Sequence, residues 1–202
     1  MKISLQNVGK RYNREWIFRH LNFDFSSAQS YAITGSNGSG KSTLLQVIAG
    51  STIHSEGKLF YEKQDGITVN EPYKYCAIAA PYLELIEELT ATELLDFHAG
   101  FKKLTASVQE ILHSVNLDKS AKKQIRYFSS GMKQRLKLAQ AFFSESDVLF
   151  LDEPTTNLDS EGISLYQNLV TNNTHNRLLI ISSNVPQEYE FCKEVIKMED
   201  FK

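Results

Sequence analysis

The stretch Tyr31–Leu45, YAITGSNGSGKSTLL, decides the fold of this 202-residue chain. It begins as a short apolar strand, breaks into a loop with three glycines, and restarts as a helix behind a lysine and two hydroxyls. Glycine tolerates backbone dihedrals that turn successive N–H groups inward, and a helix N-terminus adds partial positive charge. The stretch therefore predicts a loop that holds an anion.

The loop fits the phosphate-binding pattern G-x-x-x-x-G-K-[ST]. In this pattern Lys41 reaches the terminal phosphates and the Ser42 hydroxyl ligates Mg²⁺. The alternative is a glycine-rich strand–helix turn that binds nothing, but a strand before the loop and a helix after it favour a nucleotide site. The predicted nucleotide-binding residues are Gly35, Ser36, Asn37, Gly38, Ser39, Gly40, Lys41, Ser42 and Thr43.

A second motif, VLFLDEPTTNLD at 148–159, places Asp152 and Glu153 at the C-terminal end of an apolar strand. A carboxylate that emerges there beside a phosphate loop can hold Mg²⁺ through water, which is the predicted role of Asp152. Glu153 is the predicted catalytic residue that polarises an attacking water, and such general-base help is worth about 10²–10⁴-fold in rate. The alternative is an acidic strand end that caps the next turn.

Strand and helix signals alternate around the phosphate loop, which predicts an α/β fold with a mostly parallel sheet. Two early segments, KISLQNV and HLNFDF, alternate apolar and polar residues, which favours an antiparallel β layer near the N-terminus. The expected fold class is thus a P-loop NTPase core with a mostly parallel sheet, an N-terminal antiparallel β layer and an inserted helical subdomain, all within one domain of residues 1–202.

The helical subdomain is predicted at about 81–127, where helical signals alone interrupt the alternation. Within it, residues 90–115 are expected to form a helix. Thr90 and Glu93 have capping-box spacing at its start. Five apolar side chains fall roughly on one face of this helix, as a packed helix requires: Leu94, Leu95, Phe97, Phe101 and Leu104.

Composition excludes several classes of protein. A net charge of −2 gives no basic footprint for nucleic acid, and the apolar runs are too short to span a bilayer. The start of the chain lacks the apolar region of a secretory signal. Cys76 and Cys192 stand far apart, as reduced thiols of a cytoplasmic protein do, and the five histidines form no zinc-binding pair.

These motifs resemble the ATP-binding cassette (ABC) ATPases in order and approximate spacing over nearly the whole chain. The resemblance rests on the phosphate loop, on YFSSGMKQRLKLAQAFF at 127–143, on LFLDEPTTNLD at 149–159 and on an upstream tyrosine. The family signature, usually LSGGQ, corresponds here to residues 128–132. The resemblance implies that Ser129 and Gly131 contact the terminal phosphate of ATP bound to a second cassette, so that two chains enclose two nucleotides.

Two further residues, Tyr12 and Asp159, each allow two interpretations. Tyr12 matches the family aromatic that stacks on adenine, or it is an aromatic of the β layer. Asp159 resembles the loop that crosses between subunits and also suits the N-cap of the following helix, and both roles are compatible.

Two departures from the family pattern predict slow rather than absent hydrolysis. The family normally has a glutamine before the helical insert, where this chain has Pro81 or Ala80; Gln64 falls too early, in a hairpin turn. Metal contact would then be left to Ser42, Asp152 and water. The family histidine after the last core strand corresponds to Asn184, or to Ser183 if the register shifts by one residue. Asparagine can donate from its amide but cannot become cationic.

A single short cassette resembles the ATPase subunits of bacterial transporters. This implies an ATP- and Mg²⁺-binding subunit that forms a homodimer or heterodimer of cassettes on a transmembrane permease, at the inner face of the cell membrane, with no nucleic-acid partner. Residues Tyr82, Leu83, Leu85 and Ile86 would form an apolar landing site for the permease, or they are core of the helical subdomain. The alternatives are a nucleotide-gated binding module with little hydrolysis and a soluble ABC ATPase of an assembly complex.

Overall fold

The computed structural model describes residues 1–63 and 65–202, and the chain divides into two compact units. The first unit contains residues 1–76, 146–153 and 176–202, and the second contains 77–145 and 154–175. The predicted helical insert at 81–127 falls inside the second unit. Gln64, which the sequence places in a hairpin turn, lies outside the described residues.

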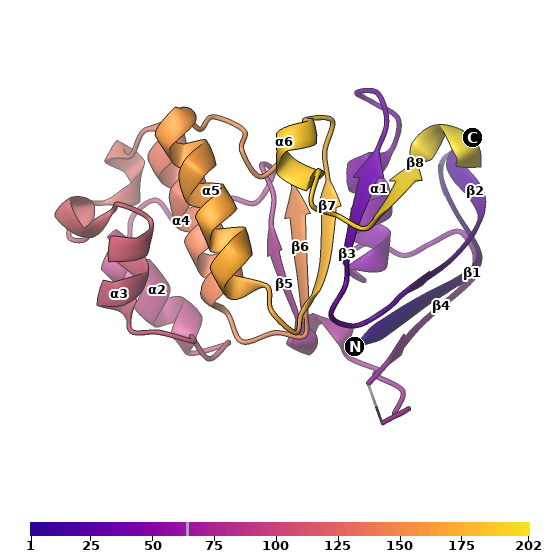
Figure 1. Ribbon diagram of the computed structural model, residues 1–202, viewed down its shortest axis with the longest axis horizontal. Coiled ribbons are helices and arrows are strands. Elements are labelled where there is room, and N and C mark those ends of the chain that lie inside the picture. Colours follow the sequence, from indigo (N-terminus) through magenta and orange to yellow (C-terminus); the bar gives the residue numbers. More distant parts are fainter. Residues whose placement is uncertain (64) are drawn as a thin grey trace. The chain divides into compact units, whose positions relative to one another are not determined.

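The first unit contains the predicted β layer and most of the parallel sheet (Figure 1). Its strands and helices are β1 (Lys2–Tyr12), β2 (Glu15–Phe25), β3 (Ser30–Thr34), α1 (Lys41–Ile48), β4 (Glu56–Glu62), β6 (Val148–Asp152), β7 (Leu178–Ser182), α6 (Pro186–Tyr189) and β8 (Glu194–Lys197), with short 3₁₀ turns at Pro72–Tyr75 and Met198–Phe201.

The second unit is helical. Strand β5 (Cys76–Ala79) begins in the first unit and ends in the second. The helices are α2 (Ala91–Ala99), α3 (Val108–Ser114), α4 (Ser130–Phe143) and α5 (Ser160–Asn173), with 3₁₀ turns at Asp118–Ser120 and Ile125–Tyr127. Among the described residues, no helix combines the length and the apolar character needed to cross a membrane.

The β layer forms because β1 and β2 alternate buried and exposed residues, as predicted. The strands pair antiparallel in the order β2-β1-β4, with Ile3 opposite both Phe25 and Tyr61. Both strands are longer than the sequence patterns indicated, because the hairpin continues to a turn in which Asn13 takes a left-handed backbone conformation (φ 54°). A short polar residue such as asparagine tolerates this conformation better than most.

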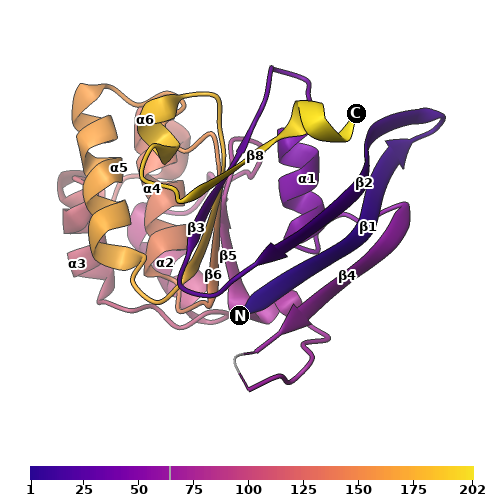
Figure 2. The same cartoon turned by 45° about the vertical axis from the view of Figure 1, so that its right-hand side comes forward.

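The parallel strands of the first unit run in the order β6-β7-β3-β8. Every residue of β6 and β7 is buried, which explains why each strand is apolar up to its last residue. Asp152 at the end of β6 pairs with Ser182 of β7, and Ile33 near the end of β3 pairs with the same serine. The carboxyl ends of the three strands therefore meet at one edge, from which the phosphate loop leads into α1 (Figure 2).

The prediction of one helix over 90–115 is wrong. Helix α2 begins at the predicted capping box of Thr90 and Glu93 but ends at Ala99. The following backbone bonds instead to the end of α4: Thr105 donates to the Phe143 carbonyl at 2.8 Å, and Glu145 donates to Lys103 at 2.8 Å. A second capping box, Ser107 with Glu110, then starts α3.

This interruption changes which apolar residues form the core. Leu94 and Leu95 are buried, whereas Phe97 and Phe101 remain 52% and 75% exposed and pack edge-on against each other. The predicted apolar face therefore breaks after the first turns of α2.

A half-buried histidine links α2 to the end of α4. His98 Nε2 lies 2.7 Å from the Ser144 hydroxyl, which itself donates to the Gln140 carbonyl at 2.5 Å. Because the single hydroxyl proton is used there, His98 must donate from Nε2. Burial lowers the pKa of His98, and the positive charge of Lys102 acts in the same direction.

We expect His98 to make stability depend on pH. The unfolded histidine, with a pKa of about 6.5, binds a proton more readily than the folded one, so stability is full above this pH and falls as the pH drops towards the lower folded value. His98→Gln should therefore lose less stability than the wild type between pH 7 and 5.5, measured as the urea midpoint. His113→Gln, at an exposed position of α3, is the control, and equal slopes for all three proteins would contradict the assignment.

Candidate nucleotide-binding site

The phosphate loop connects β3 to α1 through glycines with positive φ angles. Gly40 is the N-cap of α1 and adopts φ 101°, ψ 10°, a left-handed conformation that glycine reaches at little cost. A Cβ at Gly40 would lie 2.4 Å from the Ile17 Cγ2 atom. At Gly38, with φ 78°, a Cβ would meet nothing within 4 Å. Gly40 is thus required for space and for backbone conformation, and Gly38 for conformation alone.

Lys41 is almost fully buried, with 5% of its surface exposed. Its ammonium group donates to the Gly35 carbonyl at 2.9 Å and to the Ser36 carbonyl at 3.2 Å. A buried cation needs such partners, because desolvation without compensation is very costly. The ammonium is thereby held against the inner side of the loop by the loop's own backbone.

Asp152 is buried at the end of β6, and its Oδ1 atom has no hydrogen-bond partner within the part of the chain that the structure describes. Burial raises the pKa of Asp152. The neighbouring hydroxyls of Ser182 and Ser42 and the charge of Lys41 favour the ionised form, while Glu153 opposes it. A buried carboxylate oxygen without a partner, next to a hydroxyl, is a suitable donor set for a hard cation.

Glu153 occupies an unusual backbone position. Its φ angle of +42° is rare for a residue with a side chain, and its N–H donates to the Ser182 carbonyl at 2.8 Å. Such strained conformations cost about 1–3 kcal/mol and cluster at functional sites. Glu153 lines the same cavity as residues of the phosphate loop.

That cavity has a volume of about 250 Å³ and lies wholly within the first unit. It brings together most of the residues predicted from the loop and the acidic motif, and it adds Ile17, which the sequence patterns did not single out. The lining residues are Ile17, Asn37, Gly38, Gly40, Lys41, Ser42, Thr43 and Glu153. Ile17 could have been found by extending the alternation of β2 upstream, since it lies on the opposite face from the buried Phe18.

Asn184 approaches the phosphate loop directly. Its Nδ2 atom donates to the Asn37 side-chain oxygen at 2.9 Å. Ser183, the alternative position, is buried, and its hydroxyl accepts from the Val185 N–H at 2.8 Å. Of the two candidates, Asn184 has the side chain that reaches the loop.

Tyr12 lies at the end of β1 and is 47% exposed, with the Lys10 ammonium 4.7 Å from the centre of its ring. It is not among the described side chains that line the cavity. Its exposed ring remains available for stacking.

The predicted signature residues lie in the second unit, at the start of α4. The Ser129 hydroxyl caps this helix by accepting from the Met132 N–H at 3.2 Å. A Cβ on Gly131 would come within 3.0 Å of the Asn157 carbonyl. The next turn is also attached to the segment after the acidic motif: buried Gln134 donates to the Pro154 carbonyl at 2.8 Å.

Arg135 completes this attachment by pairing with Asp159 at 3.1 Å. Asp159 also accepts from the Gly162 N–H at 2.8 Å, so the predicted N-cap of α5 is confirmed. The start of α4 and the segment 154–159 are thus joined by side-chain and backbone contacts within one unit.

Lys137 contacts the backbone of Ala80 and Pro81, the positions at which the family resemblance leads us to expect a glutamine. Lys137 donates to the Pro81 carbonyl at 2.8 Å and contacts the Ala80 carbonyl at 3.4 Å. Burial lowers the pKa of Lys137. Sequence motifs could not reveal this contact, because it joins positions more than fifty residues apart.

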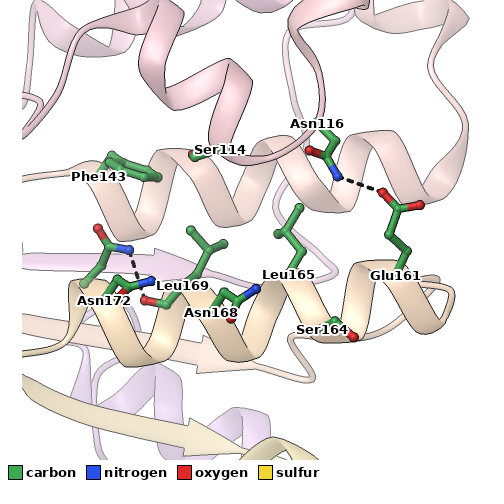
Figure 3. A pocket seen from close by; sticks show the side chains of 10 residues that line it. Ser114, Asn116, Phe143, Glu161, Ser164, Leu165, Asn168, Leu169 and Asn172 are labelled. Atoms are coloured by element: carbon green, nitrogen blue, oxygen red, sulfur yellow. Dashed lines mark hydrogen bonds between the residues drawn. The ribbon is translucent and has the colours of Figure 1, made fainter.

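A larger cavity, of about 460 Å³, lies in the second unit along α5 (Figure 3). Leucines 165 and 169 lie among amide and hydroxyl side chains, and the Asn116 amide donates to Glu161 at 2.7 Å. Its lining includes one acidic and no basic side chain, so its size alone does not make it the reactive site.

The sheet, the glycine loop and the acidic strand end define a P-loop NTPase fold, which confirms the predicted fold class. The chain superposes with a TM-score of 0.84 on a Pyrococcus furiosus protein described as an ABC transporter ATP-binding protein, at 17% identity and covering 100% of both chains. A dimeric ATP-binding cassette in a post-hydrolysis state, bound to ADP and Pi, gives a TM-score of 0.81 at 23% identity over 96% of this chain and 93% of that one.

The chain belongs to the ABC transporter family, whose model matches residues 18–156. It is 30% identical over 172 residues to the uncharacterized ABC transporter ATP-binding protein YybJ of Bacillus subtilis (strain 168), covering 83% of this chain and 78% of the relative. The resemblance inferred from the motifs is confirmed at the level of an ABC ATPase nucleotide-binding subunit.

The two glycines of the loop should respond differently to alanine. Gly38→Ala should lose roughly 1–2 kcal/mol of unfolding free energy, the cost of a left-handed conformation. Gly40→Ala should lose more, because its Cβ also meets Ile17. When Ile17 is already alanine, the additional loss caused by Gly40→Ala should fall to that of the left-handed conformation alone. Urea denaturation of Gly38→Ala, Gly40→Ala, Ile17→Ala, the Gly40→Ala/Ile17→Ala double variant and the wild type measures these losses of unfolding free energy, and equal losses at Gly38 and Gly40 would refute the close approach.

Proposed function

We propose that the protein is an ATP-binding and ATP-hydrolysing subunit that dimerises around two Mg·ATP molecules and drives transport by a membrane partner. The observation that carries the proposal is the placement of buried Lys41, the Ser42 hydroxyl and Glu153 around one cavity, next to the unpartnered oxygen of Asp152. This donor set matches what phosphoryl transfer requires: a cation for the phosphates, oxygen ligands for a metal and a group that orients water.

The residues fit magnesium. Mg²⁺ prefers a few protein oxygens and completes its shell with water and phosphate. Ser42 and Asp152 would hold it, and bound Mg²⁺ would neutralise charge on the phosphates. Within residues 1–63 and 65–202, no three His, Cys, Asp or Glu side chains gather into a group that could hold a metal ion.

The other roles follow from chemistry. The loop amides and Lys41 would bind the phosphates, since the Gly35 and Ser36 carbonyls use two of the three N–H donors of the ammonium and leave one for a phosphate oxygen. Glu153 would accept a hydrogen bond from the attacking water and take its proton as the water oxygen bonds to the terminal phosphorus. The bond from that phosphorus to the bridging oxygen would break in the same reaction, so that ADP and inorganic phosphate leave. The Asn184 amide would donate to the terminal phosphate, and Tyr12 would stack on adenine.

A second copy would complete each site. Ser129 and the side-chain-free backbone of Gly131 stand at the N-terminus of α4, where exposed N–H groups and the helix dipole favour an anion. The dimeric cassette with ADP and Pi supports this arrangement by likeness of fold. Ser129 and Gly131 of one chain would therefore contact the terminal phosphate of the ATP that is bound by the phosphate loop of the other chain.

The membrane partner would dock on the segment after Pro81. Tyr82, Leu83 and Ile86 are 45%, 36% and 42% exposed, more than core residues would be. An apolar helix of a permease subunit suits such a surface. Attachment to that partner would place this subunit at the inner face of the cell membrane.

A second candidate function is a nucleotide-gated binding module that barely hydrolyses ATP. Two observations favour it: Asn184 is already bonded to Asn37, and the carbonyls of Ala80 and Pro81 are the groups that Lys137 contacts. Phosphate release separates the candidates. Turnover no higher than that of Lys41→Ala favours the binding module.

Glu153→Gln tests the proposed hydrolysis. Without the carboxylate, steady-state phosphate release should fall about 10²–10⁴-fold, while ATP binding is retained. The trapped ATP state should shift the protein from monomer to dimer in gel filtration with Mg·ATP. Glu194→Gln, an exposed glutamate of β8, is the control and should behave as the wild type. Undiminished turnover of Glu153→Gln would exclude the assigned base.

A further inference from the structure

The C-terminal 3₁₀ turn, Met198–Phe201, packs against the outer side of the phosphate loop. It follows β8, whose Lys197 pairs with Thr34 at the end of β3. Met198 is fully buried, and a Cβ added to Gly35 would lie 3.1 Å from the Met198 Cβ atom. Figures 1 and 2 both show this turn near the N-terminal end of α1.

One peptide group of the loop is held from both sides. Its carbonyl, from Gly35, accepts from the Lys41 ammonium at 2.9 Å. Its N–H, from Ser36, donates to the Glu199 carboxylate at 3.2 Å. The ammonium and the carboxylate therefore stand at the two ends of a single peptide dipole. Hydrogen bonds in such a chain polarise each other and strengthen together.

From this geometry we infer that Glu199 is a positioning residue for the nucleotide site: it orients the Gly35–Ser36 peptide and, through it, the Lys41 ammonium. The inference deepens the proposed function and rests on it. Glu199 is not among the described residues that line the cavity, so we infer that it acts on the nucleotide through the loop. The pKa of Glu199 lies below its usual range because its own N–H and that of Ser36 donate to it, with smaller contributions from Lys202 and Lys41.

Two opposite effects of Glu199 on nucleotide affinity must be weighed. Its negative charge repels polyphosphate, but the side chain is exposed, so water and salt screen this repulsion. Its hydrogen bond instead acts at contact distance on a peptide that directly holds Lys41. Ordering the loop before the nucleotide arrives lowers the cost of binding. The ordering effect should dominate, and it should favour binding more than the chemical step.

The test compares Glu199→Ala, Glu199→Gln and Asp200→Ala. For Glu199→Ala, the Kd for a fluorescent ATP analogue and the KM for ATP should rise about 3- to 10-fold, the range for losing one exposed charge-assisted hydrogen bond. The kcat should stay within about 2-fold of wild type, because a loss confined to binding changes KM alone. Glu199→Gln keeps an acceptor oxygen for the Ser36 N–H and should restore both constants towards wild type.

Asp200→Ala is the matched control, since it removes a neighbouring exposed carboxylate from the same turn. It should leave Kd, KM and kcat unchanged. The thermal midpoints of all variants should agree, because Met198 keeps the turn packed. The inference is overturned if Glu199→Ala binds as tightly as wild type, if Glu199→Gln is as weak as Glu199→Ala, or if kcat falls while KM does not change.

Different results would refute the proposed ATP hydrolysis and the proposed role of Glu199. If wild-type protein binds the ATP analogue but releases no phosphate, the proposed hydrolysis fails, and the Kd comparison still tests Glu199. If wild type hydrolyses ATP and the alanine variant keeps its affinity, the role of Glu199 alone fails.

Discussion

The site depends on the burial of one ammonium group inside a loop that has no acidic side chain of its own. Lys41 is placed there by the first turn of α1, and the carbonyls of Gly35 and Ser36 replace its water. This exchange is possible only because glycines let the chain fold back over the lysine. The position of Gly40 against Ile17 shows that the β layer leaves no room for a side chain there. Packing of the phosphate loop against the β layer therefore requires a glycine at position 40.

Much of this fold is encoded by local signals. The phosphate loop, the apolar strands β6 and β7 and the capping box at Thr90 each appear within a few residues of sequence, and each forms where its pattern indicates. The break after α2 was missed although its signal was equally local. Ser107 and Glu110 form a second capping box, and apolar spacing alone hid it. Capping chemistry was therefore a better guide to helix boundaries than the periodicity of apolar residues.

Only part of the site could be predicted from the sequence, because some of its residues are brought there by contacts between distant parts of the chain. Its contiguous residues share a motif, whereas Ile17, Ser182 and Glu199 reach it through strand pairing and turns far away in the chain. No sequence pattern near Glu199 predicts its contact with Ser36, which lies 163 positions away. Strand register determines such neighbours, and register follows from the burial of a whole sheet face rather than from any short pattern.

The attachment of α4 to the segment 154–159 has a mechanical consequence. Gln134 and Arg135 bind this segment at two points, and Gly131 lies against its backbone. One contact is a hydrogen bond from a buried amide and the other is an ion pair with an exposed carboxylate, so separating the helix from the segment would break both. Because helix α4, which carries Ser129, is bound to segment 154–159 at these points, we expect the helix and the segment to move together.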